Sequence, residues 1–70
     1  MELRNKLKEI RTVRELTQEA LAVQIGVTRQ TIIAIEKSKF VPSVKLALEL
    51  AAALETPITE LFWLEKGAEQ

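Results

Sequence analysis

The segment from residue 18 to residue 37, QEALAVQIGVTRQTIIAIEK, constrains the fold of this chain more than any other stretch. Its apolar residues recur at helical spacing in two blocks, which are Leu21, Ala22 and Ile25, then Ile32 and Ile35. Gly26 lies between the blocks, where a helix can end on a residue with positive φ. Thr28 follows and can cap the next helix through its hydroxyl. The segment therefore predicts two short helices joined by a tight turn.

The second of these helices, about 28–37, is expected to have an exposed face that is polar at its N-terminal end and apolar further along. Arg29, Gln30, Ile33 and Ala34 point away from the apolar seam at this spacing. None of these side chains suits acid–base or nucleophilic catalysis, so the exposed face favours a binding role.

The two-helix segment resembles the helix-turn-helix of the phage lambda Cro/cI repressor family, also called the XRE family. The positions that carry the resemblance are Gln18, Ala22, Ile25, Gly26, Val27, Thr28, Ile32, Ile35 and Glu36, with Arg11, Leu16-Thr17 and Pro42-Ser43 in register around them. The likeness covers roughly residues 3 to 65. It implies an all-α fold, a compact bundle of five short helices, over a single domain of residues 1–66 with a short tail at 67–70.

Apolar spacing and capping residues place the other helices. Leu3, Leu7 and Ile10 predict a first helix from Glu2 to about Arg14, and Thr17 is expected to cap the second helix. Ser43 is a good cap for the fourth helix, whose predicted buried stripe consists of Val44, Ala47, Leu48, Ala51 and Leu54. Thr56-Pro57 is expected to start a fifth helix running to about Glu65, and Phe40 is expected to fill the core beneath the loop after the third helix.

Composition excludes several classes of function. The chain has no Cys and no His, so it lacks thiolate and imidazole metal ligands and the commonest general base. We therefore expect no metal, no cofactor and no enzymatic activity. No apolar run approaches the ~20 residues of a membrane span, and the N-terminus lacks the apolar centre of a signal peptide, so a cytoplasmic protein is expected.

The formal net charge is zero, with ten basic and ten acidic residues. The distribution is uneven, because the stretch 29–45 holds four basic residues against Glu36 alone. If Glu36 is paired internally, that stretch presents an almost purely basic surface, which is suited to phosphates. Arg11 lies beside the apolar stripe of the first helix and could simply be solvated. In the resembled family the arginine at this position pairs with the glutamate matching Glu36, which implies a partly buried ion pair here.

The resemblance implies binding to double-stranded DNA as a transcription regulator, a repressor more than an activator, with the third helix in the major groove. Expected base contacts are Thr28, Arg29, Gln30, Ile33 and Ala34, and expected phosphate contacts are Gln18, Thr31, Lys37 and Lys39. Arg29 could equally bind a phosphate, and Gln18 and the two lysines could be ordinary surface residues. The alternative function is an antitoxin-like protein-interaction module that also binds DNA, although such proteins usually carry an extension beyond the domain.

A single reading helix contacts few base pairs, so we expect a homodimer on a pseudopalindromic operator. Phe62 and Trp63 are the expected dimer interface, because both cannot face one core; alternatively Trp63 caps the core of its own subunit. The family usually has glycine where this chain has Glu15, Ser38 and Glu55, in the turns after the first, third and fourth helices. Either the backbone stays left-handed there, at a cost on the order of 1 kcal/mol per position, or the turns are rearranged.

Overall fold

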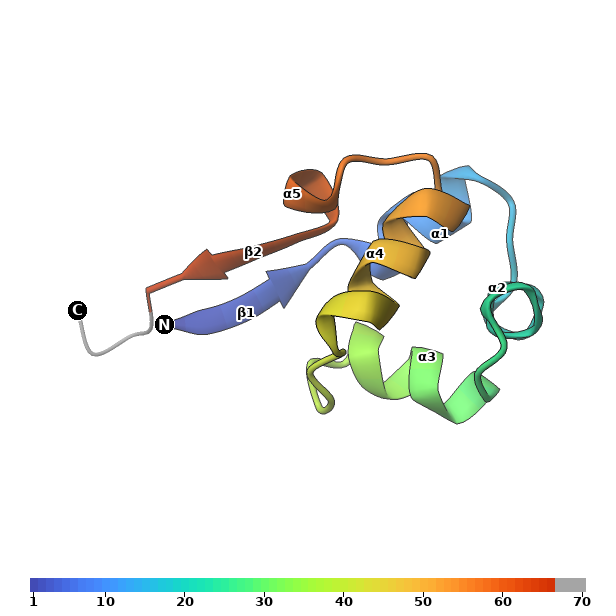
Figure 1. Cartoon of the computed structure of the whole chain (residues 1–70), viewed down its shortest axis with the longest axis horizontal. Helices are drawn as coiled ribbons and strands as arrows, with labels where there is room; N and C mark the ends of the chain where they lie inside the picture. Colours follow the sequence, from blue (N-terminus) through green and yellow to red (C-terminus); the bar gives the residue numbers. More distant parts are fainter. Residues whose placement is uncertain (67–70) are drawn as a thin grey trace.

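A computed structural model describes residues 1–66 of the chain, and the tail predicted at 67–70 lies outside the described residues. The element order is β1 (Glu2–Asn5), α1 (Leu7–Val13), α2 (Gln18–Ile25), α3 (Arg29–Glu36), α4 (Val44–Ala53), α5 (Ile58–Leu61) and β2 (Phe62–Glu65). The five helices form the body of the molecule, and the two strands extend from the end opposite α2 (Figure 1). Among the described residues, no helix is long and apolar enough to cross a membrane.

The prediction of a strictly all-α fold is wrong at both ends of the described chain. Residues 2–5 and 62–65 form a two-stranded antiparallel sheet in which Leu3 lies opposite Leu64 and Asn5 lies opposite Phe62. The first helix therefore starts at Leu7 and the fifth ends at Leu61. Exposed and half-buried residues alternate along Glu2–Asn5, as in a strand. A strand needs a partner, and that partner lies about sixty residues further along the sequence.

The sheet also explains why the C-terminal segment holds more apolar residues than one helix face can bury. Successive residues of a strand point to opposite faces. Phe62 accordingly enters the core of its own subunit, where it is 8% exposed, while Trp63 lies half-buried on the other face.

The core joins all five helices to the base of the sheet. Its fully buried members are Leu7, Leu21, Ile32, Ile35, Leu50, Leu54 and Leu61. On α4 the buried stripe is Ala47, Leu50, Ala51 and Leu54, whereas Val44 and Leu48 are exposed, so the predicted stripe was wrong in those two members. The prediction for Phe40 was also wrong, because its side chain is 46% exposed.

Side-chain capping fixes where α2, α3 and α4 begin. Thr17, Thr28 and Ser43 each accept a hydrogen bond from the backbone N–H three residues later, which confirms the three predicted N-caps. The fifth helix differs from its prediction: Pro57, not Thr56, occupies the cap position, and the Thr56 hydroxyl donates to the carbonyl of Leu54.

Four turns close on the same left-handed backbone, although only one of them contains glycine. Gly26 has φ 78°, and Glu15, Ser38 and Glu55 have φ 59°, 59° and 51°. At each turn the next N–H bonds back to the carbonyl five residues earlier, as in Lys39 to Ala34 at 2.8 Å. The left-handed alternative therefore holds at all three non-glycine positions. Those residues carry a strain that glycine does not have.

This strain gives a prediction about stability. Glu15→Gly and Ser38→Gly should each raise the free energy of unfolding by about 0.5–1 kcal/mol, because relief of left-handed strain exceeds the added entropy of the unfolded chain. Neither side chain makes a hydrogen bond among the described residues. The reverse control is Gly26→Ala, which should lower stability by about 1 kcal/mol although no atom lies within 4 Å of the added methyl group. Urea unfolding of the three variants measures these effects, and a loss of stability in both glycine variants would contradict the explanation.

Candidate nucleic-acid interface

An ion pair fixes the two helix-turn-helix elements against α1. Arg11 Nε donates to Glu36 Oε2 at 2.7 Å, and Arg11 Nη2 donates to Glu36 Oε1 at 3.3 Å. The guanidinium therefore binds the carboxylate in a bidentate manner. The side chains are only 11% and 5% exposed. Arg11 Nη1 also donates to the carbonyl of Leu16 at 2.8 Å, which holds the turn between α1 and α2.

Gln18 joins the same network at the first residue of α2. Its Nε2 donates to Glu36 Oε1 at 3.1 Å. The network therefore ties the last turn of α1, the start of α2 and the end of α3 to one carboxylate. No buried side-chain nitrogen or oxygen lacks a hydrogen-bond partner in the part of the chain that the structure describes. Sequence reasoning considered Gln18 only as a surface or phosphate-binding residue and missed this internal bond.

The network decides the charge of the surface around α3. Because Glu36 is buried and paired, it adds no negative charge to the exposed face. Arg29, Lys37 and Lys39 are exposed and form no ion pair with the described residues, while Lys45 is bound to Glu49 at 2.8 Å. The face from the start of α3 to the loop after it is accordingly basic, even though the whole chain is neutral.

The first turn of α3 presents the polar side chains. Ile32 and Ile35 are buried on the opposite face and fix the rotation of the helix about its axis. Arg29 and Gln30 are exposed, and their side chains make no hydrogen bond within residues 1–66. Both are therefore available to an external partner. A helix that enters the major groove by its N-terminal end would bring these two residues to the base edges.

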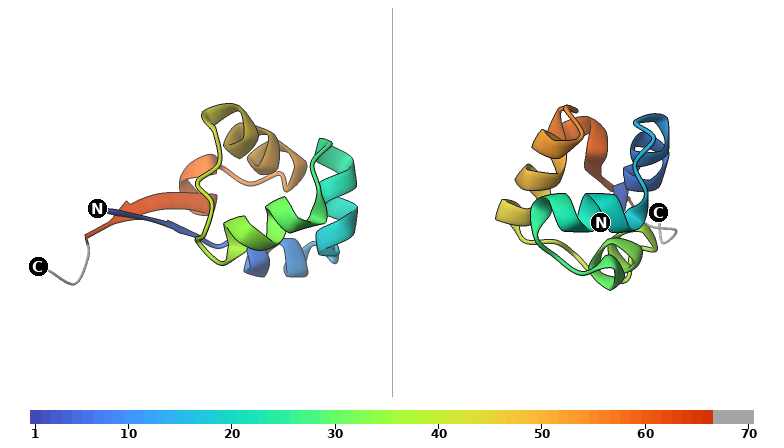
Figure 2. Two further views of the ribbon diagram at one scale, coloured as in Figure 1. Left: turned by 90° about the horizontal axis from the view of Figure 1, so that it is seen from below. Right: turned by 90° about the vertical axis from the view of Figure 1, so that its right-hand side faces the viewer.

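The remaining predicted contact residues lie around this polar end. Thr28 is exposed, and its hydroxyl lies 3.1 Å from that of Thr31, which is half-buried. Ile33 and Ala34 are half-buried one turn further along α3. Lys37 caps the C-terminus of α3, and Lys39 follows the left-handed turn at Ser38. All of these residues lie on α3 or within three residues of its ends. Phe62 and Trp63 lie on β2, at the other end of the molecule from α2 (Figure 2).

The carboxylate of Glu36 has a structural role at this face. Among the described residues, no group of three metal-ligating side chains gathers in one place. The buried carboxylate is held by three donors and serves to join helices.

The ion pair gives a second prediction about stability. Arg11→Ala or Glu36→Ala alone should lower the free energy of unfolding by about 3 kcal/mol, because each leaves a buried charge without its partner. A double-mutant cycle in urea should show strong coupling between the two positions. The control is Lys45→Ala, which breaks an equally short but exposed pair on α4 and should cost less than about 1 kcal/mol. Independent effects at positions 11 and 36 would show that the network does not join the helices.

Comparison with known proteins supports a DNA-binding role. A family model described as Helix-turn-helix matches residues 7–61. The chain is 51% identical over 63 residues to the HTH-type transcriptional regulator MJ0272 of Methanocaldococcus jannaschii, covering 90% of this chain and 96% of that protein. It is 45% identical over 64 residues to the HTH-type transcriptional regulator YgzD of Bacillus subtilis, covering 91% and 97%. Both relatives are described as uncharacterized.

Solved structures share the fold. The restriction-modification controller protein C.AhdI from Aeromonas hydrophila is 35% identical, with a TM-score of 0.73 over 77% of this chain and 82% of that one. A structure from Bacteroides fragilis has a TM-score of 0.80 at 24% identity, over 87% of this chain and 98% of that one, and supports the fold alone. With the match to the family model over most of its length, the chain belongs to the Cro/cI-type (XRE) family of helix-turn-helix, DNA-binding transcription regulators.

Proposed function

We propose that this protein regulates transcription by binding a specific double-stranded DNA site, with α3 entering the major groove by its N-terminal end. The observation that carries the proposal is the exposed, unbonded pair Arg29 and Gln30 on the first turn of a helix whose opposite face is locked into the core. The basic surface that continues to Lys39 supports it, because phosphates flank the major groove on both sides.

Base recognition falls to the N-terminal turns of α3. The amide of Gln30 can pair with N6 and N7 of adenine, and the guanidinium of Arg29 can pair with O6 and N7 of guanine. Thr28 lies beside them and can reach either a base or a phosphate. Ile33 and Ala34 offer only methyl groups, which suit the C5-methyl group of thymine.

Phosphate contacts would hold α3 in register. Lys37 and Lys39 are free of ion pairs with described residues and follow the end of α3, so they fit one strand of the duplex. Gln18 and Thr31 would contact the backbone near the start of the helices. Gln18 donates one N–H of its amide nitrogen to Glu36, and the second N–H of the same nitrogen would donate to a phosphate.

We further propose that the protein acts as a homodimer, and as a repressor more than an activator. One reading helix distinguishes few base pairs, whereas a two-fold dimer reads two half-sites about 34 Å apart, one turn of DNA. A small DNA-binding body can block a promoter simply by occupying it, while activation also requires a surface for the transcription machinery. The sheet that carries Trp63 is the proposed dimer contact. Phe62 would act indirectly, by supporting the sheet from within its own core.

The function predicts different effects for the two kinds of contact. Gln30→Ala should relax the preference at one base pair in each half-site and weaken cognate binding by about 1–3 kcal/mol. Lys37→Ala or Lys39→Ala should weaken all duplexes alike and flatten the dependence of affinity on salt concentration. The cognate site would first be selected from random duplex DNA, and binding would then be titrated over site variants and salt concentrations. If Gln30→Ala weakens cognate and scrambled duplexes equally, α3 does not read bases through that residue.

A further inference from the structure

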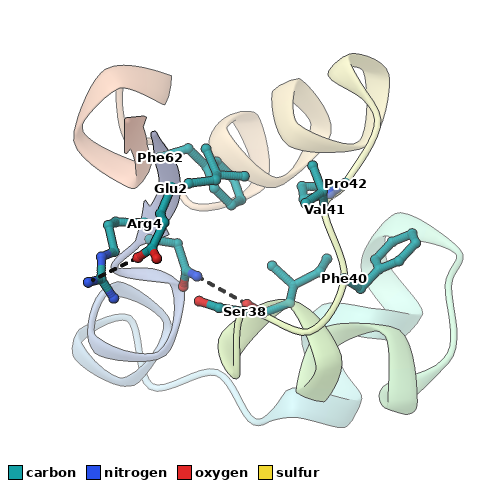
Figure 3. A pocket seen from close by; sticks show the side chains of 10 residues that line it. Glu2, Arg4, Ser38, Phe40, Val41, Pro42 and Phe62 are labelled. Carbon is teal, nitrogen blue, oxygen red and sulfur yellow. Dashed lines mark hydrogen bonds and ion pairs between the residues drawn. The ribbon is translucent and has the colours of Figure 1, made fainter. Parts of the chain in front are cut away.

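A groove of about 390 Å³ runs along β1. All four consecutive residues of β1 line it, while β2 contributes only Phe62. Its other wall is the end of α3 and the loop that follows, including Ile35, Ser38 and Val41 (Figure 3). Residues from both faces of one strand can line the same groove only along the edge of that strand. The groove therefore flanks the edge of β1 that β2 does not cover.

The hydrogen-bonding groups at this edge follow from the strand register. Lys6 N–H donates to the carbonyl of Leu61 at 3.0 Å, directly after the paired residues Asn5 and Phe62. Hydrogen-bonded pairs alternate along an antiparallel ladder, so Arg4 bonds with Trp63, and the backbone groups of Leu3 point away from β2. The free N–H and C=O of Leu3 thus point toward the groove.

We propose that this groove receives β1 of a second copy of the chain, antiparallel to the first, about a two-fold axis at Leu3. The two Leu3 residues would exchange a pair of backbone hydrogen bonds, and the two sheets would become one sheet of four strands. The inference rests on the proposed function, because it supplies the dimer that this function needs. It also names the surface through which the two copies pair.

Charge complementarity selects this edge of the sheet. With Leu3 on the axis, Glu2 of each copy lies opposite Arg4 of the other, and opposite charges directly across two strands stabilise their pairing. In the single subunit Arg4 binds Glu65 at 2.8 Å and Glu2 at 3.4 Å, and all three side chains remain about half exposed. The dimer would extend this exposed group of charges across the axis.

The free edge of β2 lacks such complementarity. A two-fold axis at Leu64 would place Trp63 opposite Glu65 and Phe62 opposite Lys66, and neither pair joins opposite charges. The edge of β2 is also the edge away from the groove, since only Phe62 of that strand lines it. Pairing through β1 therefore brings opposite charges together across the axis, whereas pairing through β2 does not.

An exposed apolar side chain lies where the second strand would cover it. Val41 is 69% exposed on the wall of the groove opposite Leu3. A second Leu3 entering the groove would take Val41 out of water. A two-stranded ribbon is at best marginally stable in water, whereas four strands with one apolar face are sufficient.

The arrangement suits the reading of two half-sites. Ile35 and Ser38, at the end of α3, line the same groove as Leu3. An axis at Leu3 therefore lies beside the C-terminal ends of both α3 helices, with their first turns directed away from it. This places Arg29 and Gln30 of the two copies at the far ends of the dimer, as separated half-sites require.

The first test removes one backbone donor at each edge. Leu3→Pro deletes an N–H that bonds to nothing in the single subunit, and proline is tolerated at such edge positions. Sedimentation equilibrium should show the dissociation constant of the dimer raised about 30-fold, since two symmetry-related hydrogen bonds are lost. The matched control is Leu64→Pro, which deletes the outward N–H of β2 and should leave the dissociation constant within about twofold. Circular dichroism checks that both variants are folded.

The second test exchanges the charges and does not depend on proline. Glu2→Arg and Arg4→Glu should each weaken the dimer, because each places like charges opposite each other across the axis. The double variant Glu2→Arg/Arg4→Glu restores opposite charges across the axis and should recover most of the lost affinity. Because the exchange also restores the pair within one subunit, the two single variants are mixed as well: opposite charges then meet only across copies, so the mixture should associate more tightly than either variant alone. No gain in the mixture, or an additive loss in the double variant, would overturn the proposed register.

Other outcomes separate this inference from the proposal that α3 binds DNA. Wild-type protein that stays monomeric at high micromolar concentration would overturn the β1 interface. The interface would also be overturned if the Leu64→Pro or Trp63→Ala variant is monomeric while the Leu3→Pro variant remains dimeric. Either result leaves DNA binding by α3 intact, which a single half-site duplex measures. A dimer that responds to the β1 variants as expected but binds no selected DNA would instead contradict the proposed function alone.

Discussion

The bond between Arg11 and Glu36 is the interaction on which the arrangement of the DNA-binding helices depends. A two-helix unit of eight residues each buries too little surface to hold its own geometry. Here one carboxylate receives donors from α1 and from the start of α2 while belonging to the end of α3. The planar guanidinium binds the carboxylate in a bidentate manner, which fixes the relative orientation of the two side chains as well as their distance. Burial of the pair contributes little net stability, but it specifies how the three helices meet.

The same bond makes a neutral protein suitable for a polyanion. Glu36 is the one acidic residue in the stretch 29–45, and its burial removes that charge from the face that would meet DNA. The exposed carboxylates of Glu2 and Glu65 lie on the sheet, and Glu65 binds Arg4 there. Net charge therefore describes this face poorly, because its acidic residue is buried while Arg29, Lys37 and Lys39 remain exposed.

Local chemistry in the sequence was sufficient to predict the helix-turn-helix but not the ends of the chain. Thr17, Thr28, Ser43 and Gly26 act on backbone groups within a few residues, so their roles follow from the sequence nearby. The strands could not be predicted in this way, because Leu3 at helical spacing from Leu7 fits a helix until Leu64 supplies a partner. Phe40 was misplaced for a related reason: the phenylalanine that enters the core is Phe62, which the pairing of β2 with β1 brings there from a distant part of the sequence, while Phe40 lines the surface groove.

Asn5 connects the sheet to the DNA-binding face. Its Oδ1 accepts a hydrogen bond from the N–H of Leu7 at 3.0 Å, and its Nδ2 donates to the carbonyl of Ile35 at 3.0 Å. One side chain thereby fixes the end of β1 both to the start of α1 and to the last turn of α3. In the proposed dimer the axis lies two residues from this connection, so little flexible chain separates it from α3. Packed backbone would then fix the distance between the two α3 helices. A fixed distance lets the dimer discriminate between operators whose half-sites are differently spaced.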